Sequence, residues 1–326
     1  MQYVKLGRSG LDVSRLCLGC LAFGVPAKGR PWTIEESESR SIIRRALDFG
    51  INFFDTANIY LEGTSEEVLG RSLHKLVRRD EVVIATKVRG RTRPGPNGEG
   101  LSRKAILHEV DASLKRLGTD YIDLYQIHCW DPDTPIEETL EALHDIVKSG
   151  KVRYIGASST LAWQLCKALY IAENRGWSRF ISMQSHVNLL YREEEREMLG
   201  LCQAEGVAMV PWSPLARGKL ARPWGHKGST RARTDADLAE LYDDTDQAEK
   251  AIVDVVGEIA AEREITRAQV ALAWLLQKPG VTAPVVGVSR MQHLVEAMGS
   301  LEVRLDDDEV RRLESNYRPR AVAGFW

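Results

Sequence analysis

Eight short apolar runs, each followed by a longer segment with a helical pattern, constrain the fold of this chain more than any other feature. The runs cover residues 16–19, 51–55, 82–87, 121–128, 153–158, 181–184, 207–212 and 283–287. They do not alternate cleanly between polar and apolar residues, which is typical of parallel strands buried on both faces. The segments between them carry one apolar stripe, as in 36–50, where Ile42, Ile43, Ala46 and Leu47 share a helix face.

Strand–helix units that follow one another without a change in composition predict an α/β fold. We expect a single (β/α)8 TIM barrel domain over residues 1–326, with an N-terminal β-hairpin turning at Gly10 and extra C-terminal helices. A doubly wound sheet is the alternative, but it would usually show a GxGxxG turn, which this sequence lacks. Thr64 and Glu67 predict a capping box, and the irregular segment 217–247 predicts a long functional loop.

The composition excludes several classes of function. The net charge is −2, so we predict neither a nucleic-acid-binding surface nor a basic membrane-binding face. No apolar run approaches the ~18 residues of a spanning helix, and the first residues lack the apolar core of a signal peptide, so we expect a cytoplasmic protein. Cys17 and Cys20 form a CxxC, but no second pair completes a zinc site, so we predict two buried strand residues and no metal.

Polar side chains end successive strands of the predicted barrel, at the edge where barrel active sites lie. Asp55, Lys87 and His128 end the second, third and fourth runs, and Tyr60 lies in the loop after Asp55. Each residue alone is more often a cap, turn or packing residue than a catalytic one. Of the seven histidines, only His128 falls at a predicted strand end. Because all four residues share one rim, we predict that they form an active site.

The chemistry of these side chains points to carbonyl reduction. A phenol with a pKa near ~10 is a poor proton donor at neutral pH, and a neighbouring ammonium lowers that pKa. Lys87 can supply this charge to Tyr60, and the carboxylate of Asp55 can keep Lys87 protonated in a dry pocket. His128 can donate a second hydrogen bond to the same substrate oxygen. Reduction of a carbonyl by hydride needs such a proton donor and oxyanion site.

The chain resembles the aldo-keto reductases in motifs that occur in family order over nearly its whole length. They are GINFFDTANIY, VVIATKV, YIDLYQIHCWD, YIGASS, SMQSHVNLLYREEE, PWSPLARGKL and VVGVSRMQHL. The resemblance looks closest to a bacterial branch that includes a reductase linked to deoxyxylulose 5-phosphate supply. It implies a catalytic tetrad in which Asp55 and Lys87 are the charge pair, Tyr60 is the general acid and His128 orients the carbonyl.

The resemblance also implies an extended NADPH/NADP+ site without a Rossmann motif. It assigns the carboxamide to Ser158, Ser159 and Gln184, the nicotinamide face to Trp212, the pyrophosphate to Ser213, Leu215, Arg217 and Gly218, the 2′-phosphate to Gly287, Ser289 and Arg290, and the adenine to His293. Two positions depart from the family pattern. Ser159 stands where the family often has Asn, and His293 and Ala297 stand where it usually has Gln and Asn near the adenine.

Three functional classes follow from these residues. The first is an NADPH-dependent reductase of an aldehyde or ketone, a small-molecule carbonyl substrate. The second is an NADPH-binding regulatory module with weak reductase activity. The third is a Schiff-base lyase, which would need Lys87 neutral and is disfavoured by Asp55. The particular substrate and the oligomeric state stay open, because fold and tetrad are shared by enzymes with many substrates.

Overall fold

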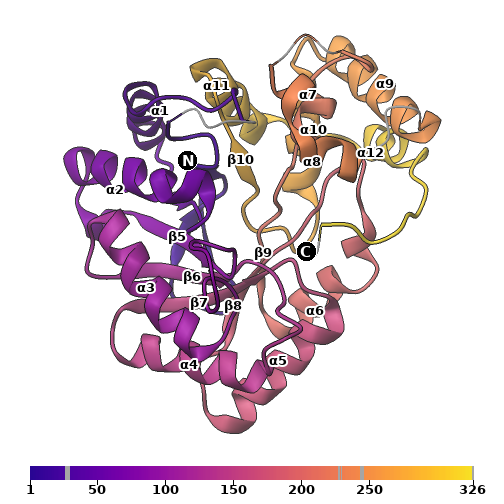
Figure 1. Cartoon of the computed structure of the whole chain (residues 1–326). Coiled ribbons are helices and arrows are strands. Elements are labelled where there is room, and N and C mark those ends of the chain that lie inside the picture. Colours follow the sequence, from indigo (N-terminus) through magenta and orange to yellow (C-terminus); the bar gives the residue numbers. More distant parts are fainter. Residues whose placement is uncertain (26–29, 227, 229, 243–245, 325–326) are drawn as a thin grey trace.

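The computed structural model describes residues 1–25, 30–226, 228, 230–242 and 246–324. Its centre is an eight-stranded parallel sheet with strand order β10-β3-β4-β5-β6-β7-β8-β9. The two outer strands of this order also meet, because Thr282 N donates to Met209 O at 2.8 Å and Val285 N donates to Pro211 O at 2.8 Å. The sheet therefore closes on itself, and helices surround it (Figure 1). This confirms the predicted (β/α)8 barrel.

Each strand of the barrel is short and precedes a helical region. The strands are β3 (Cys17–Gly19), β4 (Phe53–Asp55), β5 (Val83–Val88), β6 (Ile122–Ile127), β7 (Val152–Ser158), β8 (Phe180–Gln184), β9 (Ala208–Met209) and β10 (Val285–Gly287). The helices are α1 (Glu36–Asp48), α2 (Thr64–Leu76), α3 (Arg103–Leu117), α4 (Ile136–Lys148), α5 (Ala162–Arg175), α6 (Met198–Glu205), α9 (Gln247–Glu262), α10 (Arg267–Gln277), α11 (Met291–Gly299) and α12 (Asp307–Glu314). All eight predicted strands are present.

Two apolar clusters hold this arrangement together. The larger one lies between the sheet and the helices, where α1 contributes Ile42, Ile43 and Ala46, the stripe predicted from the sequence. The smaller one fills the barrel interior. The hairpin of β1 (Tyr3–Lys5) and β2 (Asp12–Ser14) adds Leu6 and Val13 to this inner cluster. Both side chains are fully buried, so the hairpin covers one end of the barrel and leaves the opposite rim for the loops that follow the strands.

Two local predictions differ from the structure. Thr64 does not form the predicted capping box. The residue that precedes α2 is Gly63, which has a left-handed conformation, and the Thr64 hydroxyl donates to Leu61 O at 2.8 Å. Segment 217–247 is not irregular throughout its described part; residues 227, 229 and 243–245 lie outside the described residues. It contains the 3₁₀ helix η4 (Ala216–Ala221) and the short helices α7 (Thr230–Thr234) and α8 (Ala236–Leu241). Among the residues described, no helix has the length and apolarity needed to cross a membrane.

Candidate active site

A buried ion pair joins the carboxyl ends of two neighbouring strands. Lys87 Nζ lies 2.5 Å from Asp55 Oδ2, and the side-chain exposures are 0% and 3%. Parallel pairing of β4 and β5 brings these two strand ends together, since Asp55 is in register with Ala85, two residues before Lys87. Burial by itself lowers the pKa of Lys87, but the charge of Asp55 and hydrogen bonds raise it well above its ordinary value. Lys87 is therefore an ammonium at neutral pH, as the sequence predicted.

Two glutamines fix the carboxylate of Asp55. Gln126 Nε2 donates to Asp55 Oδ1 at 3.1 Å and Gln184 Nε2 donates to the same oxygen at 2.9 Å. Both are buried, from β6 and β8 respectively. The Gln184 side chain, which the family resemblance assigns to the nicotinamide carboxamide, thus already has a partner in Asp55. A buried carboxylate needs such donors because its lost hydration is otherwise uncompensated.

Tyr60 meets the ammonium at the first turn after β4. Lys87 Nζ donates to the Tyr60 hydroxyl at 3.3 Å and to Thr56 O at 2.8 Å. Leu61 and Glu62, which follow directly, have φ values of 51° and 57°. Left-handed conformations at residues other than glycine are strained and cluster at functional sites. The turn η1 (Tyr60–Gly63) therefore has a strained backbone conformation, which keeps the phenol next to Lys87.

The net pKa shift of Tyr60 corrects a prediction. Burial raises the pKa of the phenol above its ordinary value, and the charge of Lys87 lowers it by less than burial raises it. We expected Lys87 to bring the pKa below the ordinary value. The structure instead gives a tyrosine that stays protonated, with Lys87 limiting the increase. A protonated phenol beside an ammonium can still donate a proton when negative charge develops on a bound oxygen.

His128 completes the group as a neutral ring. Its ring centroid lies 5.7 Å from that of Tyr60, with the planes at 74°. Burial lowers the pKa of His128 to about 3, and the charges of Lys87 and Arg89 add to this. Within the described part of the chain, its Nδ1 is buried without a hydrogen-bond partner. A neutral imidazole can donate one hydrogen bond to an oxygen in front of Tyr60, which is the task that the sequence suggests.

One cavity of about 670 Å³ contains nearly all the predicted residues. Asp55, Tyr60 and His128 line it, while Lys87 lies buried behind them. All twelve residues that the resemblance assigns to the cofactor also line this cavity: Ser158, Ser159, Gln184, Trp212, Ser213, Leu215, Arg217, Gly218, Gly287, Ser289, Arg290 and His293. Residues at or after the carboxyl ends of six different strands thus converge on one space. The structure brings together every predicted site residue.

Side-chain partners within the cavity refine these assignments. The Ser158 hydroxyl donates to Gln184 O at 3.0 Å, and Arg217 Nη1 pairs with Asp235 at 2.8 Å. Arg222, which we did not select from the sequence, also lines the cavity. Burial lowers the pKa of Arg222, and the like charge of Arg290 lowers it further. Arg290, which directly precedes α11, and Arg222, which follows η4, make this end of the cavity suited to an anion.

A second histidine at this rim was not among the residues predicted from the sequence. His186 follows β8 by two residues, is 1% exposed and stacks on Trp212 with ring centroids 4.2 Å apart. Its Nε2 lies 2.7 Å from the hydroxyl of Tyr242, which ends α8. The strand rule could have identified His186, because alternate residues after β8 point the same way as Gln184. Tyr242 carries no such signal, because its contact with His186 spans 56 residues.

The barrel and the residues at this rim are characteristic of one protein family. The sequence matches the Aldo/keto reductase family over residues 15–318. The match covers well over half of the chain. The chain therefore belongs to the aldo/keto reductase family and is an oxidoreductase.

Several fungal proteins are similar to the chain over almost its entire length. Versiconal hemiacetal acetate reductase of Aspergillus parasiticus is 45% identical, covering 99% of this chain and 98% of the relative. An aldo-keto reductase of Fusarium vanettenii is 40% identical, covering 99% and 93%. A protein of Schizosaccharomyces pombe, named as a candidate aryl-alcohol dehydrogenase, is 41% identical, covering 99% and 97%. Our prediction of a bacterial branch linked to deoxyxylulose 5-phosphate is therefore wrong, since these relatives are fungal.

The buried, neutral state of His128 predicts how stability depends on pH. The pKa of His128 is about 3 in the folded chain, against 6.5 for a free side chain. Below pH ~6.5 the unfolded chain therefore binds more protons than the folded one, and the free energy of unfolding falls as the pH falls. His128→Gln should reduce the loss of stability between pH 7 and pH 5, measured by urea unfolding at both values. An unchanged loss in the variant would contradict the neutral, buried state of His128.

Proposed function

We propose that this chain is an NADPH-dependent reductase that converts an aldehyde or ketone to an alcohol, with Tyr60 as the proton donor. The observation that carries the proposal is the contact of Lys87 Nζ with both Asp55 at 2.5 Å and the Tyr60 hydroxyl at 3.3 Å. This contact places a fixed positive charge beside a protonated phenol at the wall of a large cavity. Few other chemical tasks require a buried ammonium that is held charged and turned toward a tyrosine.

The cavity fits an extended, anionic nucleotide. Its described lining includes Arg222 and Arg290, whose like charges lie close enough for Arg290 to lower the pKa of Arg222. A phosphate between them would relieve this repulsion. Gly287 leaves open space beside the start of α11, because a Cβ added there would contact nothing within 4 Å. We propose that Arg290 and Arg222 hold the 2′-phosphate of NADPH, while Trp212, Ser158 and Ser159 surround the nicotinamide.

The side chains at the other end of the cavity would handle the carbonyl oxygen. A reduced nicotinamide, when bound, supplies a hydride to a carbonyl carbon. The hydroxyl of Tyr60 and the neutral ring of His128 would each donate a hydrogen bond to the carbonyl oxygen. As negative charge grows on that oxygen, Tyr60 would transfer its proton to it. The ammonium of Lys87 would then stabilise the phenolate, and the carboxylate of Asp55 would stabilise the ammonium.

The charged state of Lys87 argues against a Schiff-base lyase. A lysine that attacks a carbonyl must be neutral and must have its amine free to approach the substrate. Here Nζ is committed to Asp55, Thr56 and Tyr60, and its side chain has no exposed surface. The names of the relatives, a reductase and an alcohol dehydrogenase, are consistent with redox chemistry at a carbonyl or alcohol.

Tyr60→Phe tests the proton donor. The variant lacks only the hydroxyl, so NADPH should still bind, but turnover should fall at least ~100-fold, the usual scale of general acid catalysis. Turnover is measured as NADPH oxidation over a panel of aldehydes and ketones. Tyr125→Phe is the matched control, because Tyr125 is fully buried on β6 and its hydroxyl has no hydrogen-bond partner among the described residues. Near-normal turnover of Tyr60→Phe would disprove the assignment.

Arg290→Ala tests the choice of nucleotide. Loss of a charge-assisted contact with the 2′-phosphate should weaken NADPH binding by roughly 1.5–3 kcal/mol and leave NADH binding almost unchanged. Calorimetric titration with both nucleotides measures the difference. Arg311→Ala is the control, because Arg311 lies on α12, pairs with Asp308 and is 70% exposed. Equal losses for NADPH and NADH would be evidence against a 2′-phosphate contact at Arg290.

A further inference from the structure

Three aromatic rings form a stack behind the cavity wall. His186 lies between Trp212 and Tyr191, at centroid distances of 4.2 Å and 4.1 Å and interplanar angles of 11° and 9°. We call these three residues the ring stack. His186 and Tyr191 are buried, whereas Trp212 is partly exposed and lines the cavity. Because His186 covers one face of the indole, the orientation of Trp212 depends on where His186 is held.

His186 is also held by Tyr242, which follows the cavity-lining residues Arg217 and Arg222 in the chain. The Tyr242 hydroxyl lies 2.7 Å from His186 Nε2 and accepts a hydrogen bond from Asn188 Nδ2 at 2.9 Å. Asn188 Nδ2 also donates to Ser213 O at 2.9 Å. Tyr242 is 4% exposed and directly follows α8, in the same stretch of chain as Arg217 and Arg222. One buried hydroxyl therefore connects this stretch to the ring stack.

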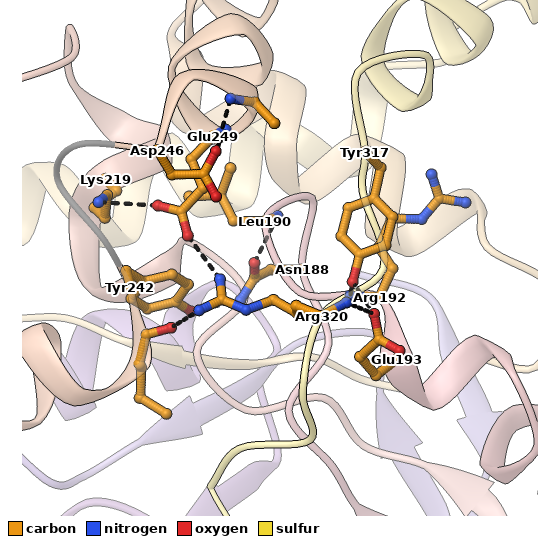
Figure 2. Close-up of polar contacts among 12 residues, drawn as sticks. Asn188, Leu190, Arg192, Glu193, Lys219, Tyr242, Asp246, Glu249, Tyr317 and Arg320 are labelled. Atoms are coloured by element: carbon orange, nitrogen blue, oxygen red, sulfur yellow. Dashed lines mark hydrogen bonds and ion pairs between the residues drawn. The ribbon is translucent and has the colours of Figure 1, made fainter.

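Residues 320–324, called the tail below, contact both the ring stack and the residues around Tyr242. Ala323 N donates to the Tyr191 hydroxyl at 3.1 Å, and Gly324 packs against Trp212, where an added Cβ would lie 2.9 Å from the indole. Figure 2 shows the Arg320 guanidinium between Glu249 and the carbonyl of Leu241, next to Tyr242. Lys219 pairs with Glu249 from the other side at 3.1 Å. Contacts of the tail with Glu249, Leu241 and Tyr191, together with the contact between Tyr242 and His186, thus join these residues and the ring stack in one network.

The electrostatic state of His186 suits a packing role. Burial holds the pKa of His186 well below its ordinary value, and the charges of Arg217 and Arg320 add to this effect. The ring is therefore neutral and can stack between two aromatic rings without the cost of burying a charge. His186 does not belong to the group of Asp55, Tyr60, Lys87 and His128. Its position behind Trp212 is the feature that needs an explanation.

We infer that His186 and Tyr242 are positioning residues that set the orientation of the Trp212 ring. The inference rests on the proposed function, in which the nicotinamide lies against the free face of Trp212. Tyr242 fixes the ring of His186 through one hydrogen bond, and His186 fixes the indole plane by stacking. The alignment of the nicotinamide on Trp212 then depends on this hydrogen bond. An indole that tilts by a small angle would misalign the reacting atoms and slow hydride transfer.

The test compares Tyr242→Phe, which deletes only the hydroxyl, with the wild-type protein. Both are labelled with 5-fluorotryptophan, and the ¹⁹F resonance of Trp212 is assigned by its loss in Trp212→Phe. We expect Tyr242→Phe to shift or broaden this resonance, with NADPH and without it. The single-turnover rate of hydride transfer to an aldehyde should fall at least ~5-fold. The dissociation constant for NADPH should stay within about twofold, because segment 216–242 keeps its other contacts.

A second variant and a control separate positioning from loss of structure. His186→Phe keeps a ring in the stack and removes the same hydrogen bond, so the double variant should be no slower than the slower single one. Tyr317→Phe is the control, because Tyr317 donates to Glu193 at 2.7 Å but does not touch the ring stack. It should leave the Trp212 resonance and the transfer rate unchanged.

Three outcomes would overturn the inference and can be told apart. If the wild-type protein binds no NADPH, the proposed function fails and the inference fails with it. If the wild-type protein binds NADPH and reduces the aldehyde, but Tyr242→Phe has the same Trp212 resonance and the same transfer rate, only the positioning role is disproved. A variant with weaker NADPH binding and a lower melting temperature, but a normal transfer rate, would likewise assign Tyr242 a purely structural role.

Discussion

The ion pair between Asp55 and Lys87 is the interaction on which the rest of this site depends. Two charges without contact with water are costly to bury, and only close geometry and further hydrogen bonds offset that cost. The barrel supplies both. Parallel pairing brings the ends of β4 and β5 together, and Gln126 and Gln184 reach the same carboxylate from β6 and β8. Side chains from four strands thus converge on one charge, which is possible only because the sheet closes.

The Asp55–Lys87 ion pair affects the protonation of two side chains in front of it, Tyr60 and His128. Lys87 counteracts the rise that burial causes in the pKa of Tyr60, and the same ammonium helps to keep His128 neutral. Tyr60 thereby remains a proton donor whose anion would be stabilised, and His128 remains an uncharged hydrogen-bond donor. Environments that separate the protonation states of neighbouring groups are how enzymes assign acid and orienting roles. The electrostatics therefore support reduction of a carbonyl, independently of any particular substrate.

Most of the barrel and the four central residues could be predicted from the sequence, because their signals are local. A buried strand reads as an apolar run, and in a barrel the residues that end successive runs share one rim. The capping box at Thr64 was wrong because Leu61 and Glu62 take left-handed conformations that no short motif announces. Arg222 and Tyr242 were missed because their partners lie far away in the sequence, whereas His186 could have been identified from its spacing of two residues after Gln184. The pKa of Tyr60 depends on the balance between burial and charge, which only the three-dimensional structure reveals.

The most direct test asks whether Asp55 is what keeps Lys87 charged. In Asp55→Asn the side chain keeps its size, but Lys87 becomes a buried cation without its counter-ion, and its pKa should fall. Nitrogen-15 NMR of the lysine Nζ, assigned with Lys87→Met, follows its protonation directly. We predict that Lys87 stays protonated up to at least pH ~9 in the wild-type protein and loses its proton at a clearly lower pH in Asp55→Asn. A Lys87 that titrates identically in both proteins would contradict the account.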